Sequence, residues 1–133
     1  MGRKKARENA FKCVFALGFE NEYNLDNLLS SLSDGQDILE DEKEYIVNTF
    51  MGTYNNLKEI DEIILSNLKG WTIDRISKVD LAVLRLAIYE IKYDKNVPYK
   101  VSVNEAVEIA KAYGDDKSQS FVNGLLAKVE KNV

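Results

Sequence analysis

Apolar residues recur every three or four positions through almost the whole chain, which is the spacing of one face of an α-helix. No segment alternates apolar and polar residues in the way typical of a half-buried strand, and the chain contains a single proline. The pattern predicts an all-α fold, a compact bundle of about seven helices forming one domain over residues 1–133. The expected helices cover residues of about 4–19, 25–32, 41–68, 72–78, 79–91, 102–113 and 118–131.

Local signals predict where several of these helices begin and how they pack. Asp80 is the expected N-cap of the central helix, and Ser102 with Glu105 forms the expected capping box of the next helix. Gly52 lies inside the longest helix, where glycine costs about 1 kcal/mol against alanine. We therefore expect either a close approach of another helix or a bend at Gly52.

Two side chains lie on apolar helix faces, where we expect residues to be buried. The helix over residues 79–91 is apolar nearly all round, so Arg85 within it must be paired if it is buried, with Glu105 or Glu108 as candidate partners. Cys13 lies on the apolar face of the first helix, where we expect an inert structural thiol.

Composition narrows the possible functions. The chain has no histidine and one cysteine, which excludes imidazole-based catalytic triads, the common zinc sites and a disulfide framework. It has no P-loop and no Gly-x-Gly-x-x-Gly run, and no apolar stretch approaches the roughly 18 residues of a membrane span. We expect a cytoplasmic protein that is not an enzyme and uses no cofactor or metal. The net charge of −4 argues against a general polyanion binder.

A local concentration of positive charge stands out against this acidic background. The first twelve residues contain five cations and one acid, whereas the remaining 121 residues contain 13 cations and 21 acids. A helix N-terminus is already the positive end of the helix dipole, so cations there work against the field unless an anion such as phosphate binds. Arg3, Lys4, Lys5 and Arg7 are therefore candidates to bind the phosphates of a nucleic acid. Phe11 and Phe15 lie beside them; they either pack against a neighbouring helix, which we favour, or meet bases.

Several blocks of residues carry a family pattern. They are Arg3-Lys4-Lys5-Ala6-Arg7-Glu8; Trp71-x-x-x-Arg75 followed by Val79-Asp80-x-Ala82-Val83-Leu84-Arg85-Leu86-Ala87-x-Tyr89-Glu90; Val97-Pro98-Tyr99-Lys100-Val101 followed by Val103-Asn104-Glu105-Ala106-Val107-Glu108-x-Ala110-Lys111; and Phe121-Val122-Asn123-Gly124-Leu125-Leu126. In this order they resemble the NusB transcription antitermination family. The resemblance spans the whole chain, and only residues 23–38 lack a recognisable signature.

The resemblance implies a fold and a function. The fold would be two packed helical subdomains, with Trp71 expected as an anchor between them. The function would be binding of boxA RNA in nascent ribosomal RNA transcripts together with NusE, a small-subunit ribosomal protein. The pair would act on RNA polymerase with other Nus factors and help it pass terminators. The protein itself would be a monomer or a homodimer.

The resemblance also implies site residues beyond the basic start. The loop before the Phe-Val-Asn-Gly block lies in the family's RNA-contacting region, which adds Lys117 and Ser118 to the RNA-binding candidates. Lys117 stands where relatives often carry an acid, so it should strengthen attraction to phosphate. Asp80 matches a family position implicated in binding NusE, and we add Glu105 and Glu108 because an acidic surface would steer a basic protein partner.

Three alternatives remain open from the sequence. The same fold serves as the N-terminal domain of some ribosomal RNA cytosine methyltransferases, although this chain has no room for a methyltransferase domain. A module that binds only protein would leave the charge at the N-terminus unexplained. A disordered basic tail is disfavoured because the apolar stripe already begins at Ala6.

Overall fold

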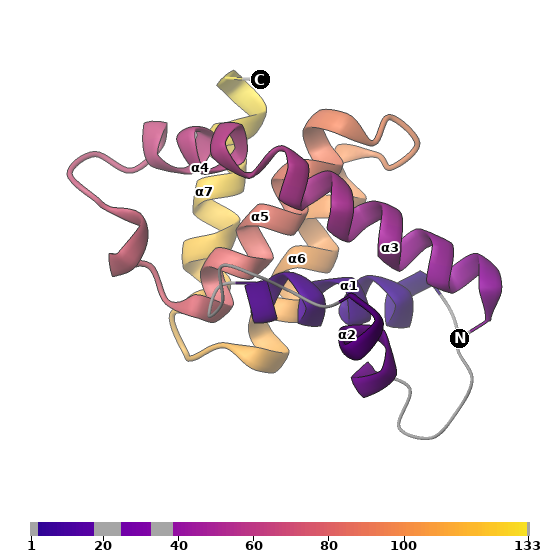
Figure 1. Cartoon of the computed structure of the whole chain (residues 1–133). Helices are drawn as coiled ribbons and strands as arrows, with labels where there is room; N and C mark the ends of the chain where they lie inside the picture. Colours follow the sequence, from indigo (N-terminus) through magenta and orange to yellow (C-terminus); the bar gives the residue numbers. More distant parts are fainter. Residues whose placement is uncertain (1–2, 18–24, 33–38, 133) are drawn as a thin grey trace.

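The computed structural model describes residues 3–17, 25–32 and 39–132 (Figure 1). Within these residues the chain forms seven α-helices and no strand, as the periodicity predicted. The elements are α1 (Arg3–Leu17), α2 (Leu25–Leu32), α3 (Glu40–Asn55), α4 (Leu57–Ser66), the short 3-10 helix η1 (Ile73–Arg75), α5 (Lys78–Tyr93), α6 (Tyr99–Tyr113) and α7 (Ser118–Asn132).

Helix α5 is the centre of the bundle. It packs against α1, α3, α4, α6 and α7, and all its residues from Leu81 to Ile88 are buried. Helix α1 packs on both α2 and α3, and α6 packs on α7, so two groups of helices share a core around α5. Figure 1 shows α5 in the middle of the molecule, with α7 on its left and α6 on its right. This arrangement agrees with the expected pair of packed helical subdomains.

The apolar stripe predicted for the first helix is buried as a whole. Its residues are at most 8% exposed and pack into the common core; they are Ala6, Ala10, Cys13, Val14 and Leu17. Phe11 is also buried, so α1 inserts most of its circumference into the bundle and leaves a narrow outer face. None of the described helices is long and apolar enough to cross a bilayer.

The single long helix expected over residues 41–68 is in fact two helices, α3 and α4, which meet at Asn56. The backbone of Asn56 has φ −116° and ψ 19°, outside the α-helical region, and its side-chain amide donates to the Gly52 carbonyl at 2.8 Å. That hydrogen bond satisfies a carbonyl in the last turn of α3. Periodicity missed the break because buried apolar residues continue on both sides of it, at Phe50 and Ile60.

Two expected helix starts were wrong. The N-cap of α5 is Ser77, whose hydroxyl accepts from the backbone N–H of Asp80 at 3.1 Å, so Asp80 lies in the first turn. Helix α6 begins at Tyr99, directly after Pro98, and Ser102 lies inside it. Proline lacks the N–H that a helix start leaves unsatisfied, and the Ser102 hydroxyl instead donates to a buried carboxylate described below.

The structure also corrects the tertiary contacts predicted for Arg85 and Trp71. Arg85 is buried, but its partner is Asp61 of α4, which accepts from Nε at 2.9 Å and from Nη2 at 2.8 Å. This bidentate pair replaces the expected contact with Glu105 or Glu108. Trp71 is 43% exposed and packs only at the surface, with its ring centroid 5.8 Å from that of Phe121, so it is not a buried anchor.

The close approach predicted at Gly52 is confirmed, and we expect Gly52→Ala to destabilise the protein. A Cβ at this position would overlap the ring of Tyr89 on α5. Overpacking of this kind costs about 1–3 kcal/mol against the roughly 1 kcal/mol that alanine gains in helix propensity, which leaves a net loss of up to about 2 kcal/mol. Urea denaturation would measure the loss.

A matched control separates the two effects of that substitution. Gly124 lies in the exposed part of α7, and a Cβ there would meet nothing within 4 Å. Gly124→Ala should therefore stabilise the protein by up to about 1 kcal/mol. Equal stabilisation by both substitutions would contradict the close packing of α3 on Tyr89.

Candidate nucleic-acid interface

A buried carboxylate joins four helices near the start of α1. Glu90 of α5 is 1% exposed and accepts from Arg7 Nε at 2.9 Å, from Ser102 Oγ at 3.1 Å and from Tyr45 OH at 3.4 Å. These donors come from α1, α6 and α3. The network therefore fixes the position of α1 against the rest of the bundle.

This network corrects the role predicted for Arg7. The residue is only 5% exposed, so its guanidinium does not lie on the surface with the lysines of the same segment. Burial disfavours the charged form, but the hydrogen bond and charge of Glu90 outweigh it and leave the pKa of Arg7 raised. Arg7 is thus a permanent cation that is neutralised inside the protein, and it is not a phosphate contact in this structure.

The outer face of α1 carries the remaining candidates. Lys4 and Lys5 are exposed, and Phe15 is half-buried further along the helix. Arg3 lies in α1, but its side chain is outside the described part of the structure, so its predicted role is untested. The cations that remain on the outer face of α1 are therefore lysines. We call this surface, which extends from the first turn of α1 to Phe15, the lysine face of α1.

Two residues that the sequence interpretation missed complete this face. Tyr113, at the end of α6, is 39% exposed, and Lys12 Nζ lies 5.9 Å from the centre of its ring. The ring packs on Phe11 with centroids 5.1 Å apart, and its hydroxyl donates to Glu8. Burial and the contact with Glu8 raise the pKa of Tyr113 to about 12.

These contacts make Tyr113 a firmly held aromatic surface beside a cation. Such a surface suits a nucleic-acid base, because aromatic rings stack on bases and cations hold the adjoining phosphates. Lys12 was visible in the sequence as one of the five N-terminal cations. Nothing in the sequence near Tyr113 shows that it packs on α1, because its contact with Glu8 joins residues 105 positions apart.

The two remaining candidates for RNA contact lie in the loop before α7, and they differ in their exposure to solvent. Lys117 is exposed, whereas Ser118 is 1% exposed. Ser118 Oγ accepts from the backbone N–H of Asp115 at 3.0 Å, and Asp115 Oδ1 accepts from the N–H groups of Lys117 and Ser118 at 2.8 and 3.1 Å. The predicted contact of Ser118 with RNA is therefore corrected, since its hydroxyl shapes the loop and is not available at the surface.

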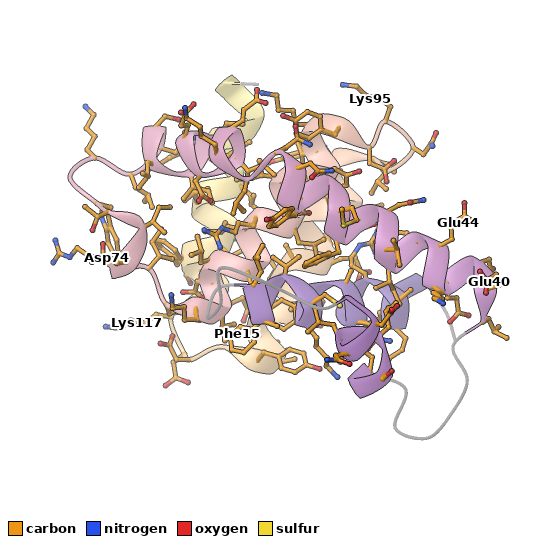
Figure 2. All side chains as sticks on the ribbon, in the orientation of Figure 1. Phe15, Glu40, Glu44, Asp74, Lys95 and Lys117 are labelled. Atoms are coloured by element: carbon orange, nitrogen blue, oxygen red, sulfur yellow. The ribbon has the colours of Figure 1, made fainter. Side chains whose placement is uncertain are left out.

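An aromatic pair, the half-buried Phe121 and the exposed Trp71, lies one helical turn from Lys117. The N–H of Phe121 donates to the Lys117 carbonyl at 3.0 Å, and Trp71 packs on the Phe121 ring. In Figure 2, Phe15 and Lys117 lie toward the same end of the molecule. Two stretches of surface thus combine cations with aromatic rings, one along α1 and one at the start of α7.

The three acidic residues predicted to bind a protein partner do not all lie on one surface. Glu105 and Glu108 line one groove of about 500 Å³ between α6 and α7, together with Asn104, Gln119 and Asn123. Asp80 is 8% exposed at the start of α5 and does not line that groove. Its Oδ1 has no hydrogen-bond partner among the described residues. The structure therefore brings Glu105 and Glu108 together and leaves Asp80 apart.

The described residues offer no metal site and no reactive thiol. They include no group of three or more carboxylate, cysteine or histidine side chains placed to hold an ion. Cys13 is buried as predicted, and burial raises the pKa of its thiol to about 11, which keeps it protonated.

Comparisons with known proteins agree with this arrangement. The model of the NusB family matches residues 4–131. The transcription antitermination protein NusB of Acetivibrio thermocellus is 44% identical over 131 residues, covering 98% of this chain and 90% of that protein. NusB of T. maritima has a solved structure with a TM-score of 0.88 and 37% identity, covering 98% of this chain and 92% of that one.

A further solved structure contains antitermination factors NusB and NusE in complex with double-stranded RNA. It matches with a TM-score of 0.86 and 30% identity, covering 98% of this chain and 97% of that one. The match of the family model over nearly the whole chain, together with these relatives, shows that the chain belongs to the NusB family.

Proposed function

We propose that this chain is a transcription antitermination factor that binds boxA RNA of nascent ribosomal transcripts together with NusE. The observation that carries the proposal is the match to NusB over residues 4–131. The protein would act in the cytoplasm with RNA polymerase and other Nus factors, without catalysis. A relative of the same fold crystallised with NusE and RNA supports both partners.

The lysine face of α1 is the proposed RNA surface. Lys4, Lys5 and Lys12 would hold phosphates, and Tyr113 and Phe15 would meet bases. Short single-stranded RNA is recognised by this combination of a cationic surface and stacking rings. Helix α1 has 15 residues and is therefore about 22 Å long, enough to hold several nucleotides.

The start of α7 would extend this surface. Lys117 is exposed and adds a cation, while Trp71 and Phe121 add rings. Arg3 stays a proposed RNA contact at the first position of α1. For NusE, the groove between α6 and α7 is the proposed interface, because Glu105 and Glu108 suit the basic side chains of a ribosomal protein.

A binding titration tests the function directly. Labelled boxA RNA and a scrambled RNA of equal length would be titrated with this protein, alone and with NusE. We expect tighter binding to boxA than to the scrambled RNA, and a further gain when NusE is present. Equal, weak binding to both RNAs in both conditions would contradict the proposal and favour a module that binds only protein.

A further inference from the structure

A groove of about 380 Å³ opens on the other side of Arg7 from the core. Its walls come from α1, α3, the connection between α5 and α6, and the first turn of α6; the lining residues are Arg7, Tyr45, Asp94, Asn96, Val97, Pro98 and Val101. In Figure 2, Glu40 and Glu44 of α3 lie at the right-hand edge of the molecule, and Lys95 lies near the top. The groove is separate from the α6–α7 groove and shares no residue with it.

The floor of the groove contains hydrogen-bond donors without acceptors. Arg7 is 5% exposed, and its Nε donates to Glu90. The N–H groups on its two terminal nitrogens have no hydrogen-bond partner among the described residues. These N–H groups are not among the fully buried polar atoms that lack a partner, so they are accessible from the groove and can donate to an acceptor of a guest in place of water.

The charges around the groove decide which acceptor fits. Glu90 already neutralises Arg7, and Asp94 adds a carboxylate at the rim. The first turn of the neighbouring α3 carries three acids, Glu40, Asp41 and Glu42. A phosphate or carboxylate guest would be repelled here, whereas a neutral carbonyl can accept from Arg7 and a cation can approach Asp94.

The remaining wall is apolar and accessible. Val101 is 41% exposed, Pro98 is exposed, and Val97 is half-buried between them in the chain. An aliphatic side chain of a guest would cover this wall and remove apolar surface from water. An extended peptide supplies all three elements at once, because it presents backbone carbonyls, aliphatic side chains and cations along one strand.

We propose that this groove binds an extended basic segment of a protein partner. A backbone carbonyl of the segment accepts from Arg7, an aliphatic side chain packs on Val97 and Val101, and a flanking lysine or arginine pairs with Asp94. This site goes beyond RNA binding and does not depend on it. It also gives the buried Arg7 a second role besides holding Glu90.

Two capped peptides of opposite charge test the proposal. N-acetyl-Lys-Val-Lys-amide and N-acetyl-Glu-Val-Glu-amide would each be titrated into the ¹⁵N-labelled full chain, while the backbone amide signals of Asn96, Val97 and Val101 are followed by NMR. We expect saturable shifts at these amides with the lysine peptide and none with the glutamate peptide. Val101→Lys, at an exposed position that should not disturb folding, is expected to weaken the lysine peptide about tenfold or more.

Three outcomes would overturn the proposal. They are the absence of saturable shifts at the groove, equal affinity of the lysine peptide for the Val101→Lys variant, and shifts of the groove amides by boxA RNA in place of the peptide. Because Val101 lies outside the proposed RNA surface, boxA binding by Val101→Lys is measured in parallel. Loss of peptide binding with unchanged RNA binding supports the groove, and failure of the wild type to bind RNA contradicts only the proposed function.

Discussion

Replacing Glu90 by alanine is expected to lower the free energy of unfolding by about 3–5 kcal/mol. The substitution leaves the buried Arg7 guanidinium without its counterion and removes the acceptor of the Ser102 hydroxyl. An uncompensated charge in the interior is one of the few mechanisms that produce so large a loss. Equilibrium denaturation in urea, followed by circular dichroism, measures it.

Two control variants show whether the loss comes from this network. Glu108 is exposed on α6, so Glu108→Ala should change stability by no more than about 0.5 kcal/mol. The double variant Arg7→Met, Glu90→Met removes both buried charges, and we expect it to be more stable than Glu90→Ala. If Glu90→Ala and Glu108→Ala were equally stable, the network would not hold α1 in the way the structure indicates.

Replacing Lys4, Lys5 and Lys12 together by alanine is expected to weaken boxA RNA binding about a hundredfold at 0.1 M salt. Each lysine that neutralises a phosphate of single-stranded RNA releases about 0.7 of a counterion, which is worth roughly fivefold in affinity at that salt concentration. The three side chains lie on the outer part of α1, so their removal should leave the core intact. Fluorescence anisotropy with labelled RNA measures the change.

A charge-matched variant distinguishes a local site from general attraction. Lys58, Lys69 and Lys95 are exposed on α4 and on the connections that follow α4 and α5. Their joint replacement by alanine changes the net charge of the protein equally, but it should alter boxA affinity by less than about threefold. Equal losses in the two triple variants would mean that RNA responds to net charge and not to the face of α1.

Much of the fold could be predicted from the sequence, because helix periodicity is a local property. The stripe from Ala6 to Leu17 and the almost wholly apolar α5 both lie where the pattern placed them. The errors occurred where one side chain redirects the backbone. Asn56 ends α3 with its own amide, and Ser77 starts α5 three residues before the expected cap.

The candidate site could be predicted only in part, because its geometry depends on long-range contacts. Arg7 and Lys5 are both cations of the first helix, yet Glu90, 83 residues away, draws Arg7 into the interior. Ser118 is likewise buried by its hydrogen bonds in the loop before α7. Tyr113 reaches the surface of α1 only through the packing of α6, which leaves no local signal.

The salt dependence of boxA binding is the most direct test that the lysine face of α1 holds the RNA backbone. Affinity would be measured between about 50 and 200 mM salt for the wild type and for the variant lacking Lys4, Lys5 and Lys12. Loss of three phosphate contacts should make the slope of log affinity against log salt shallower by about 2. Identical slopes for the two proteins would contradict the account, because those lysines would then neutralise no phosphate.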